Sequence, residues 1–146
     1  MQIELKIDPS CKEPKVVIST ASMTEEVNAL LNRLPGDIPH IISGTRDDKL
    51  EVLEPSELIR IYANAGKVFA VTEKGEYTLR LRLYEVEQRL SPQQFARISN
   101  SEIINLKKVD HFDLSFAGTI CVNLTNKETT YVSRRYVSKI KKKLGI

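Results

Sequence analysis

Apolar and polar positions alternate through most of residues 50–132, which is the pattern of half-buried strands. Residues 77–83 give the clearest case, because a tyrosine and three leucines take turns there with Thr78, Arg80 and Arg82. Successive side chains of a strand point to opposite faces, so the apolar set would face a core and the arginines would face water. The predicted strands are residues 50–53, 58–63, 68–72, 77–83, 109–116, 120–124 and 129–132.

A different spacing, with apolar residues three or four positions apart, predicts helices over residues 22–34, 83–90 and 133–144. The first of them has a continuous apolar stripe, which is typical of a helix that packs on a core or on a second copy. That stripe consists of Met23, Val27, Leu30, Leu31 and Leu34. The residues expected to start and stop the helices are Ser22 and Glu25 as a capping box, Pro35-Gly36, Ser133 and Gly145.

The N-terminal part of the chain is predicted to be a small β-β-α-β extension. Its elements are the helix described above and strands at residues 1–8, 15–20 and 38–42. The segment 43–48 is polar and contains Gly44, so we expect a linker there. The predicted organisation is therefore an extension of residues 1–44 and a main domain of residues 45–146. The fold class is mainly β (α+β), with packed antiparallel sheets and short helices.

Two stretches place polar or basic side chains where a strand is expected to pass into a helix. They are residues 95–105 and 131–140, in which Asn100 and Arg135 would project outward while isoleucines such as Ile103 anchor the backbone. Arginine pairs bidentately with guanine and asparagine with adenine in the major groove. Asparagine is also a common helix cap, and a surface arginine is commonly only solvated. Spacing alone does not choose between these two interpretations.

Composition excludes several classes of protein. No stretch approaches the roughly 20 apolar residues of a membrane span, and the alternating start lacks the order of a secretory signal, so we expect a cytoplasmic protein without stable membrane insertion. Cys11 and Cys121 lie far apart, which gives no support to a disulfide framework or a metal site. His40 and His111 belong to no catalytic motif. No phosphate-binding loop or nucleophile motif is present, so no enzyme activity and no cofactor are predicted.

Charge is unevenly distributed along the chain. The formal net charge is +3, but residues 95–146 contain ten basic and four acidic residues. Concentrated positive charge attracts the phosphate backbone of nucleic acids, because neutralising phosphates releases counterions. The lysines of residues 139–143, taken alone, are equally typical of a solvated helix face.

The stretch Arg97-Ile98-Ser99-Asn100-Ser101-Glu102-Ile103-Ile104-Asn105, with Phe95 before it and Val109 after it, resembles the signature of the LytTR family of bacterial DNA-binding domains. Val132-Ser133-Arg134-Arg135-Tyr136, followed by Lys139-Ile140, is similar to the closing strand and helix of that family. The resemblance covers about residues 46–146. It implies an almost all-β fold that presents loops, not a recognition helix, to successive major grooves of double-stranded DNA.

The resemblance also implies roles for individual residues. Asn100 and Arg135 fall where family members contact bases. Asn64 and Lys67 belong to an earlier loop in which some members use histidine, so Lys67 would serve there as a further base or phosphate contact. The residues expected to hold phosphates or brace the loops are Asn64, Arg97, Ser99, Ser101, Ser133, Arg134, Lys139 and Lys142. Asn105 is expected to stabilise the turn by bonding to the backbone.

The predicted function is a sequence-specific transcriptional regulator that binds double-stranded DNA as a homodimer, or as two copies on repeated half-sites. The extension of residues 1–44 would pack on the main domain or form a dimer contact. Stand-alone members of this size are similar to regulators encoded beside a small membrane protein, which makes such a protein a candidate partner. The alternative is a protein-interaction module that keeps the fold without binding DNA. RNA binding has less support, because no exposed aromatic platform is evident.

Overall fold

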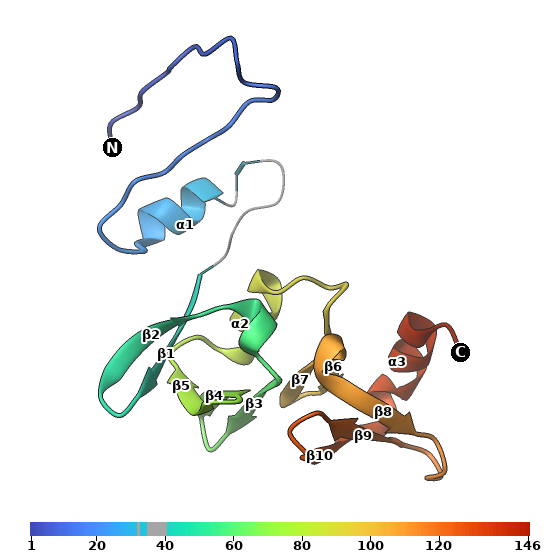
Figure 1. The fold of residues 1–146 in the computed structure, drawn as a ribbon. Coiled ribbons are helices and arrows are strands. Elements are labelled where there is room, and N and C mark those ends of the chain that lie inside the picture. Colours follow the sequence, from blue (N-terminus) through green and yellow to red (C-terminus); the bar gives the residue numbers. More distant parts are fainter. Residues whose placement is uncertain (32, 35–40) are drawn as a thin grey trace. The chain divides into compact units, whose positions relative to one another are not determined.

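The structure is a computed structural model that describes residues 1–31, 33–34 and 41–146. The chain divides into two compact units, Met1–Ile38 and Pro39–Ile146, and each is described by itself. The order of the elements can be followed in Figure 1. None of the helices in the described ranges has the length and apolar character needed to cross a membrane.

The first unit contains one helix, α1 (Glu25–Leu31), in its described residues. The strands predicted at residues 1–8 and 15–20 are wrong, since neither segment is paired in the structure. Alternation makes a strand only when a neighbouring strand accepts its backbone hydrogen bonds, and neither segment has such a neighbour among the described residues. The helix cap also differs from the prediction, because Thr24 Oγ1 accepts the hydrogen bond from Val27 N at 3.2 Å. The Pro35-Gly36 stop and the first residues of the predicted 38–42 strand lie outside the described residues.

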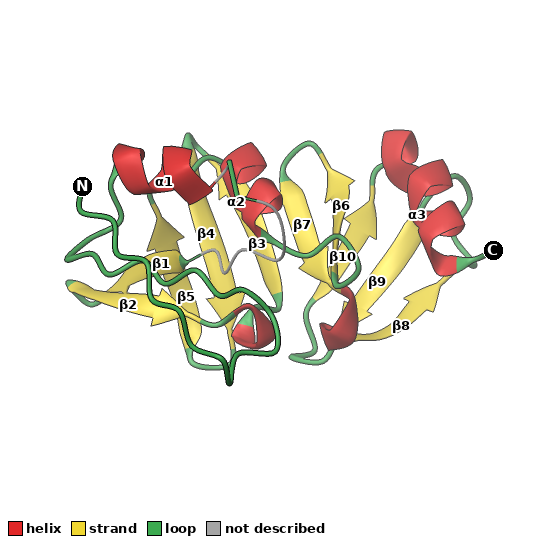
Figure 2. Cartoon of the chain, turned by 90° about the horizontal axis from the view of Figure 1, so that it is seen from above, coloured by secondary structure: helices red, strands yellow, loops and turns green. Residues whose placement is uncertain are grey.

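The second unit is built on a seven-stranded antiparallel sheet in the order β2-β1-β5-β4-β3-β7-β6. The bounds are β1 (Ile42–Arg46), β2 (Lys49–Leu53), β3 (Arg60–Asn64), β4 (Lys67–Thr72), β5 (Gly75–Leu79), β6 (Phe95–Ser99) and β7 (Glu102–Asn105). A second sheet, in the order β10-β9-β8, consists of β8 (Val109–Asp113), β9 (Ile120–Leu124) and β10 (Thr129–Val132). Figure 2 shows the two sheets side by side. The predicted mainly antiparallel β fold with short helices is confirmed.

Short helices connect these strands. The α-helices are α2 (Leu83–Arg89) and α3 (Val137–Leu144), and three 3₁₀ turns are η1 (Pro55–Glu57), η2 (Leu106–Lys108) and η3 (Arg134–Tyr136). Gly145 ends α3 with φ 76°, a left-handed conformation that glycine adopts without steric cost. The helix predicted over residues 83–90 is confirmed as α2. The helix predicted over residues 133–144 is confirmed from Val137 onward, but residues 134–136 form the 3₁₀ turn η3 and the Ser133 side chain makes no capping hydrogen bond. The strand predicted over residues 77–83 is shorter than expected, because β5 ends at Leu79.

The segment 43–48 is not a linker. Ile42–Arg46 is strand β1, and Asp47 and Asp48 form the hairpin turn to β2 with φ values of 51° and 61°. Two successive residues with positive φ give a hairpin turn whose twist matches the flanking strands, and aspartate tolerates this conformation. The predicted boundary after Gly44 therefore falls inside a strand of the second unit.

Two hydrophobic cores lie on opposite faces of the large sheet. The first packs α2 on strands β1 to β5, through side chains such as Leu83, Val86 and Ile61. The second lies between β6 and β7, the three-stranded sheet and α3, with Ile98, Ile104 and Ile140 at its centre. Strands β6 and β7 contribute to both cores, so the turn between them is fixed relative to both sheets.

Gly44 of β1 packs closely against Tyr77 and Leu53 in the first core, which leaves little room for a larger residue. A Cβ atom added at Gly44 would lie 2.6 Å from Tyr77 Cβ and 3.0 Å from Leu53 Cδ1. Overpacking of this kind costs about 1–3 kcal/mol, so Gly44→Ala should lower the free energy of unfolding by about that amount. Urea denaturation measures it, with the exposed neighbour Thr45→Ala as the matched control. Equal unfolding midpoints for the two variants would contradict the close contact.

Candidate nucleic-acid interface

Two turns lie at the same end of the large sheet. The first joins β3 to β4 through residues 64–67, and its Ala65 and Gly66 have φ values of 51° and 77°. The second joins β6 to β7 through residues 99–102. Strands β3 and β7 are paired, and Ala63 N donates a hydrogen bond to Ser101 O at 2.8 Å. The ladder therefore places these two turns next to each other.

A third segment, leading from β10 through η3 into α3, joins them. Ser133 N donates a hydrogen bond to Ile98 O at 2.8 Å, which connects the end of β10 to β6. The hydroxyl of Tyr136 donates to Asn100 Oδ1 at 3.2 Å, across 36 residues of sequence. Arg134 and Arg135 lie between these two contacts and are exposed. The two stretches singled out from the sequence, around Asn100 and around Arg135, are thus brought together.

The β6–β7 turn is braced from within. Arg97 donates from Nε to Ser99 O at 2.7 Å and from Nη2 to Asn100 O at 2.6 Å. Its Nη1 forms an ion pair with Glu87 Oε2 at 3.1 Å. The Ser99 hydroxyl accepts a hydrogen bond from Ser101 N at 3.1 Å. The backbone of the turn is held by side chains that are themselves partly buried, while Asn100 is exposed at the tip.

Asn100 is not a helix cap. The sequence predicted that a strand passes into a helix here, but residues 99–102 are the turn of a hairpin and β7 follows directly. The error has a physical cause, because Ile103 and Ile104 are both buried on opposite faces of one strand. A strand buried on both faces has apolar residues at adjacent positions, so it lacks the apolar–polar alternation from which a strand is predicted.

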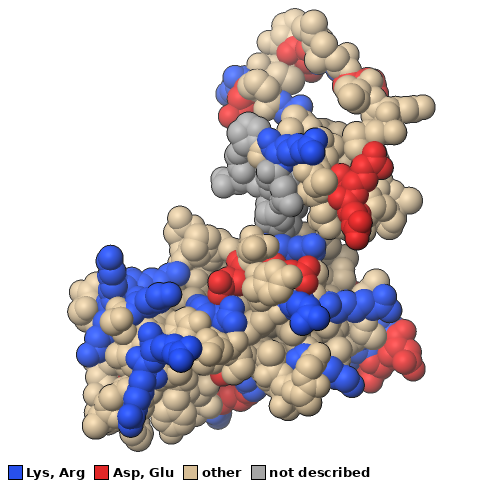
Figure 3. Space-filling model, turned by 180° about the vertical axis from the view of Figure 1, so that it is seen from behind, with Lys and Arg blue, Asp and Glu red and all other residues tan. Residues whose placement is uncertain are grey.

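Positive side chains surround the three segments. Lys67, Arg134, Arg135, Lys139 and Lys142 are exposed, as are Asn64 and Ser101, while Ser133 is half-buried. Lys139 Nζ lies 5.5 Å from the centre of the Tyr136 ring, within the range of a cation–π contact. In Figure 3 the Lys and Arg side chains gather over the side of this unit that carries the C-terminal elements. This distribution is the electrostatic requirement for attracting a polyanion.

A network of ion pairs centred on Arg60 joins the large sheet to the three-stranded sheet. Arg60 of β3 pairs with Glu102 of β7 at 3.4 Å and with Glu128, in the turn before β10, at 2.7 Å. Glu102 also accepts a hydrogen bond from Thr130 Oγ1 at 2.7 Å. The guanidinium of Arg60 lies 4.5 Å from the centre of the Tyr62 ring. Each partner comes from a different strand or turn, so the network fixes β10 on the large sheet.

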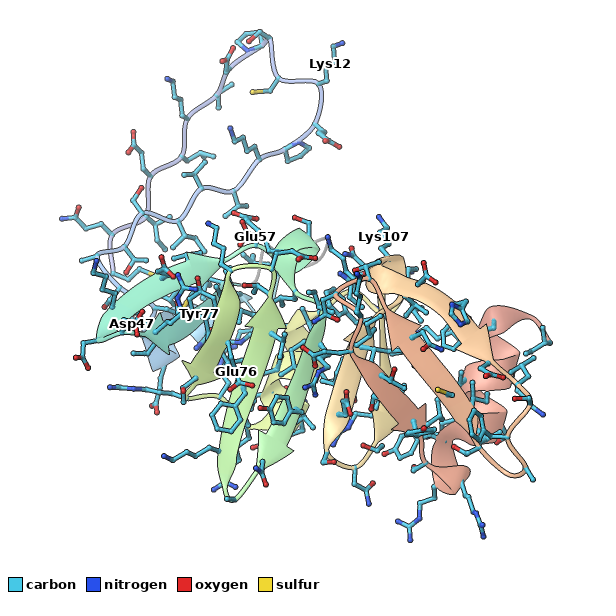
Figure 4. All side chains as sticks on the ribbon, turned by 60° about the horizontal axis from the view of Figure 1, so that its bottom comes forward. Lys12, Asp47, Glu57, Glu76, Tyr77 and Lys107 are labelled. Carbon is cyan, nitrogen blue, oxygen red and sulfur yellow. The ribbon has the colours of Figure 1, made fainter. Side chains whose placement is uncertain are left out.

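Two groups in this region have shifted pKa values. Burial raises the pKa of the Glu102 carboxyl, and the hydrogen bond from Thr130 and the charge of Arg60 oppose that rise only in part. The hydrogen bond to Glu76 raises the pKa of Tyr62 to about 12. Glu76 is labelled in Figure 4, on the face of β5 opposite to that of the buried Tyr77. Tyr62 therefore stays protonated as a hydrogen-bond donor at all physiological pH values.

Asn105 has the role expected from the sequence. It is completely buried, its Nδ2 donates to Leu58 O at 2.7 Å, and its Oδ1 accepts from Lys107 N at 3.0 Å. A buried amide must satisfy its hydrogen bonds to be tolerated, and here it connects β7 to the backbone before β3. The prediction that Asn105 stabilises a turn through backbone contacts is confirmed.

Several residues of the site could not be found from the sequence. Tyr136 directly follows Arg135, but its contact with Asn100 depends on packing between segments far apart in the chain. Lys143 Nζ donates to Phe95 O at 3.0 Å, which connects α3 to β6 through a residue of the lysine run. Within the described ranges, no three His, Cys, Asp or Glu side chains are grouped as metal ligands.

Comparisons with known proteins agree with this geometry. Residues 48–145 match the family model described as the LytTr DNA-binding domain. Over its whole length the chain is 33% identical to proteins named uncharacterized HTH-type transcriptional regulators from Staphylococcus aureus strains NCTC 8325 and COL, covering 99% of each. A solved LytTr DNA-binding domain from Bacillus cereus has the same fold, with a TM-score of 0.70 at 24% identity, over 73% of this chain and 97% of that one.

The raised pKa of Glu102 predicts how stability depends on pH. The folded state keeps a proton on Glu102 at pH values where the unfolded chain has lost it, so ionisation of this group lowers the free energy of unfolding. The stability of the wild type relative to Glu102→Gln should therefore fall as pH rises from about 4.3, the usual value for glutamate, through the raised folded value. Urea denaturation of both proteins between pH 4 and pH 8 measures this difference. Parallel curves would contradict the prediction.

Proposed function

Since the chain belongs to the LytTR family of DNA-binding domains, we propose that it regulates transcription by inserting the turns of its second unit into successive major grooves of double-stranded DNA. The observation that carries the proposal is the hydrogen bond from Tyr136 to Asn100, which joins the two segments proposed to read bases. The helices in the described ranges are separated by strands, so they offer no helix–turn–helix. Loops are then the elements available for base contact.

In this proposal, base contacts and phosphate contacts come from different side chains. Asn100 at the tip of the β6–β7 turn and Arg135 in η3 are exposed and read base edges, with Lys67 of the neighbouring hairpin as a further contact. Arg134, Lys139 and Lys142 approach phosphates, together with the smaller polar groups of Asn64, Ser101 and Ser133. Phosphate contacts set the position of the protein on the duplex, and base contacts carry the sequence preference. Arg97 and Ser99 have their donors and acceptors engaged within the turn, which favours a bracing role.

The Tyr136 hydroxyl gives the Asn100 amide a defined orientation. By donating to Oδ1 it engages the oxygen of the exposed amide and leaves the two Nδ2 hydrogens as the donors available to a partner. The amide then approaches the groove with its donors first, and N7 of a purine is an acceptor in reach of such a group. A side chain already held in one orientation loses less rotamer freedom on binding.

Two copies on repeated half-sites follow from the small number of reading groups. Each base pair read correctly contributes about 1–3 kcal/mol of discrimination, and a bacterial genome offers roughly a million competing sites. At about 2 kcal/mol each, three reading side chains in one copy give about 6 kcal/mol, which is less than the roughly 8 kcal/mol that corresponds to a millionfold excess of competing sites. We therefore propose a homodimer or tandem pair acting on DNA in the cytoplasm, with a small membrane protein as the candidate regulator of its activity.

Substitutions at the tips should separate base reading from phosphate attraction. A preferred site is first selected from a random duplex pool. On that site Arg135→Ala should weaken binding by about 1–3 kcal/mol and relax the preference at one base pair. Lys142→Ala should weaken binding to all duplexes alike and reduce the slope of affinity against salt concentration by about one. Fluorescence anisotropy on preferred and random duplexes measures both effects.

Two outcomes would count against the proposal. An equal loss on preferred and random duplexes for Arg135→Ala would remove its base-reading role. Absence of any binding to genomic fragments or to the random pool would favour the interaction module that keeps this fold without binding DNA.

The role of Tyr136 has its own test. Tyr136→Phe removes only the hydroxyl that orients Asn100, so affinity for the preferred site should fall by about 0.5–1.5 kcal/mol, the net value of one hydrogen bond. The preference at the base pair read by Asn100 should relax, and binding to random duplex should stay unchanged. Tyr131→Phe is the matched control, because Tyr131 is exposed on β10 and packs on Phe116 through its ring. Identical specificity profiles for wild type and Tyr136→Phe would contradict the positioning role.

A further inference from the structure

The first residues of the chain present apolar side chains to water. Ile3, Leu5 and Ile7 are 92%, 86% and 85% exposed, and they alternate with charged residues as in a strand. Residues 1–8 are extended but pair with no strand in the described part of the chain. Figures 1 and 4 draw this segment as a loop without an arrow, and Lys12, labelled in Figure 4, lies just beyond it. An alternating segment with unpaired backbone groups is a template for pairing with another strand.

The segment has a defined end. Cys11 N donates a hydrogen bond to Asp8 O at 3.1 Å, and Asp8 Oδ1 accepts from Ser10 N at 2.9 Å and from Ser10 Oγ at 2.7 Å. This turn, with Pro9 at its second position, stops the extended run after Ile7. The pairing segment, here called the arm, is therefore residues 2–8.

The sequence of the arm is complementary to itself. When two copies lie antiparallel with Leu5 opposite the partner's Leu5, Ile3 lies opposite the partner's Ile7 and Glu4 opposite the partner's Lys6. Apolar side chains then share one face, Glu4 and Lys6 each meet a side chain of opposite sign, and Asp8 lies opposite the partner's uncharged Gln2. Both kinds of cross-strand pair stabilise a sheet. The arrangement has twofold symmetry, the commonest symmetry of protein dimers.

Other registers lack this match. Sliding one arm by two residues brings Glu4 opposite the partner's Glu4, or Lys6 opposite the partner's Lys6, according to the direction. A shift by one residue sets apolar side chains opposite charged ones. Parallel pairing in register places like charges together at both positions. Among the antiparallel registers that overlap by five residues or more, only the one centred on Leu5 satisfies the apolar and the charged positions together.

We propose that the arms of two copies of this chain pair as antiparallel strands centred on Leu5 and so join the copies into a dimer. A two-stranded ribbon alone is marginal in water, so further surface must contribute. Val16 and Val17, which are 67% and 70% exposed, supply it as flanking residues of the same unit. The relatives from Staphylococcus aureus match this chain over its whole length, so they include the part that contains the arm. The proposal concerns the first unit and does not depend on how the second unit reads DNA.

Charge reversal tests the register. Glu4→Lys and Lys6→Glu each create two like-charge pairs in the dimer, so each should weaken dimerisation by about tenfold. The double variant Glu4→Lys/Lys6→Glu restores opposite charges at both positions and should dimerise like the wild type. Sedimentation equilibrium of the full chain at low salt, without DNA, measures the association. The circular dichroism spectrum shows whether each variant stays folded.

Two results would overturn the proposal. One is a wild type that stays monomeric at about 100 µM, where even weak specific dimers form. The other is a double variant as weak as the single ones, which would mean that the arm pairs with a different strand. Strand β2, at the edge of the large sheet, is one such strand.

A cysteine crosslink tests the position of the twofold axis. In a Cys11→Ser background, Leu5→Cys places two thiols directly opposite each other, at a Cβ separation of about 4.5–5.5 Å that mild oxidation can close into a disulfide. Ile3→Cys is the matched control, because its twin lies four residues away along the ribbon, roughly 13 Å. We expect a covalent dimer for Leu5→Cys and little for Ile3→Cys on a non-reducing gel. Equal crosslinking of both variants, or none of either, would overturn the register. DNA affinity does not enter either experiment, so failure here is distinguishable from failure of the proposed function.

Discussion

The alternation of side chains along β6 and β7 is the constraint on which the second unit depends. In β6, Phe95 enters the first core while Ala96 and Ile98 enter the second. In β7, Ile103 and Ile104 divide in the same way. A strand pair buried on both faces cannot rotate or slip by one residue without exchanging the contents of the two cores. The hairpin tip that carries Asn100 therefore keeps a fixed position relative to both sheets.

Hydrogen bonds carry this rigidity from the cores to the exposed tip. Arg97 lies beside the buried residues of β6 and donates to the carbonyls of Ser99 and Asn100. Tyr136, at the end of η3, completes the arrangement from the segment between β10 and α3. A rigid tip loses little conformational entropy when it meets a partner, and a flexible one would lose about 1–2 kcal/mol for each backbone residue that became ordered. In the proposed recognition of DNA, these bracing residues would act without touching the partner themselves.

Much of the second unit was predictable from the sequence, and the reasons are local. Strands such as β9 and β10 have strong alternation and clear turns, and the predicted spans of residues 120–124 and 129–132 match them. The helix near the C-terminus follows from its apolar spacing and from Gly145. Asn105 was interpreted correctly, because an asparagine between a strand and a turn commonly bonds to backbone groups.

The errors arose where distant parts of the chain decide the structure. Residues 99–102 form a hairpin turn because two cores bury both faces of β7, and no local pattern reports a second core. Tyr136 depends on a contact across 36 residues, and the ion network of Arg60, Glu102 and Glu128 joins strands far apart in sequence. Residues 1–8 have the pattern of a strand but no partner strand in the part of the chain that the structure describes. Alternation of apolar and polar residues shows that a segment can form a strand, but the strand forms only when a second strand is there to pair with it.

The unpaired alternating segment of residues 1–8 bears on DNA recognition if it links two copies of the chain. A few exposed side chains per copy give limited discrimination between DNA sequences, while two linked copies bind the second half-site at the effective concentration set by their linkage. Linkage increases affinity without adding any base contact, so a modest interface between arms is enough to change occupancy of a paired site by orders of magnitude. In the proposed dimer, the short arm, self-complementary at Glu4 and Lys6, would supply such an interface without altering the residues proposed to read bases. Selection on pairing and selection on base recognition can then act on different residues of the same small chain.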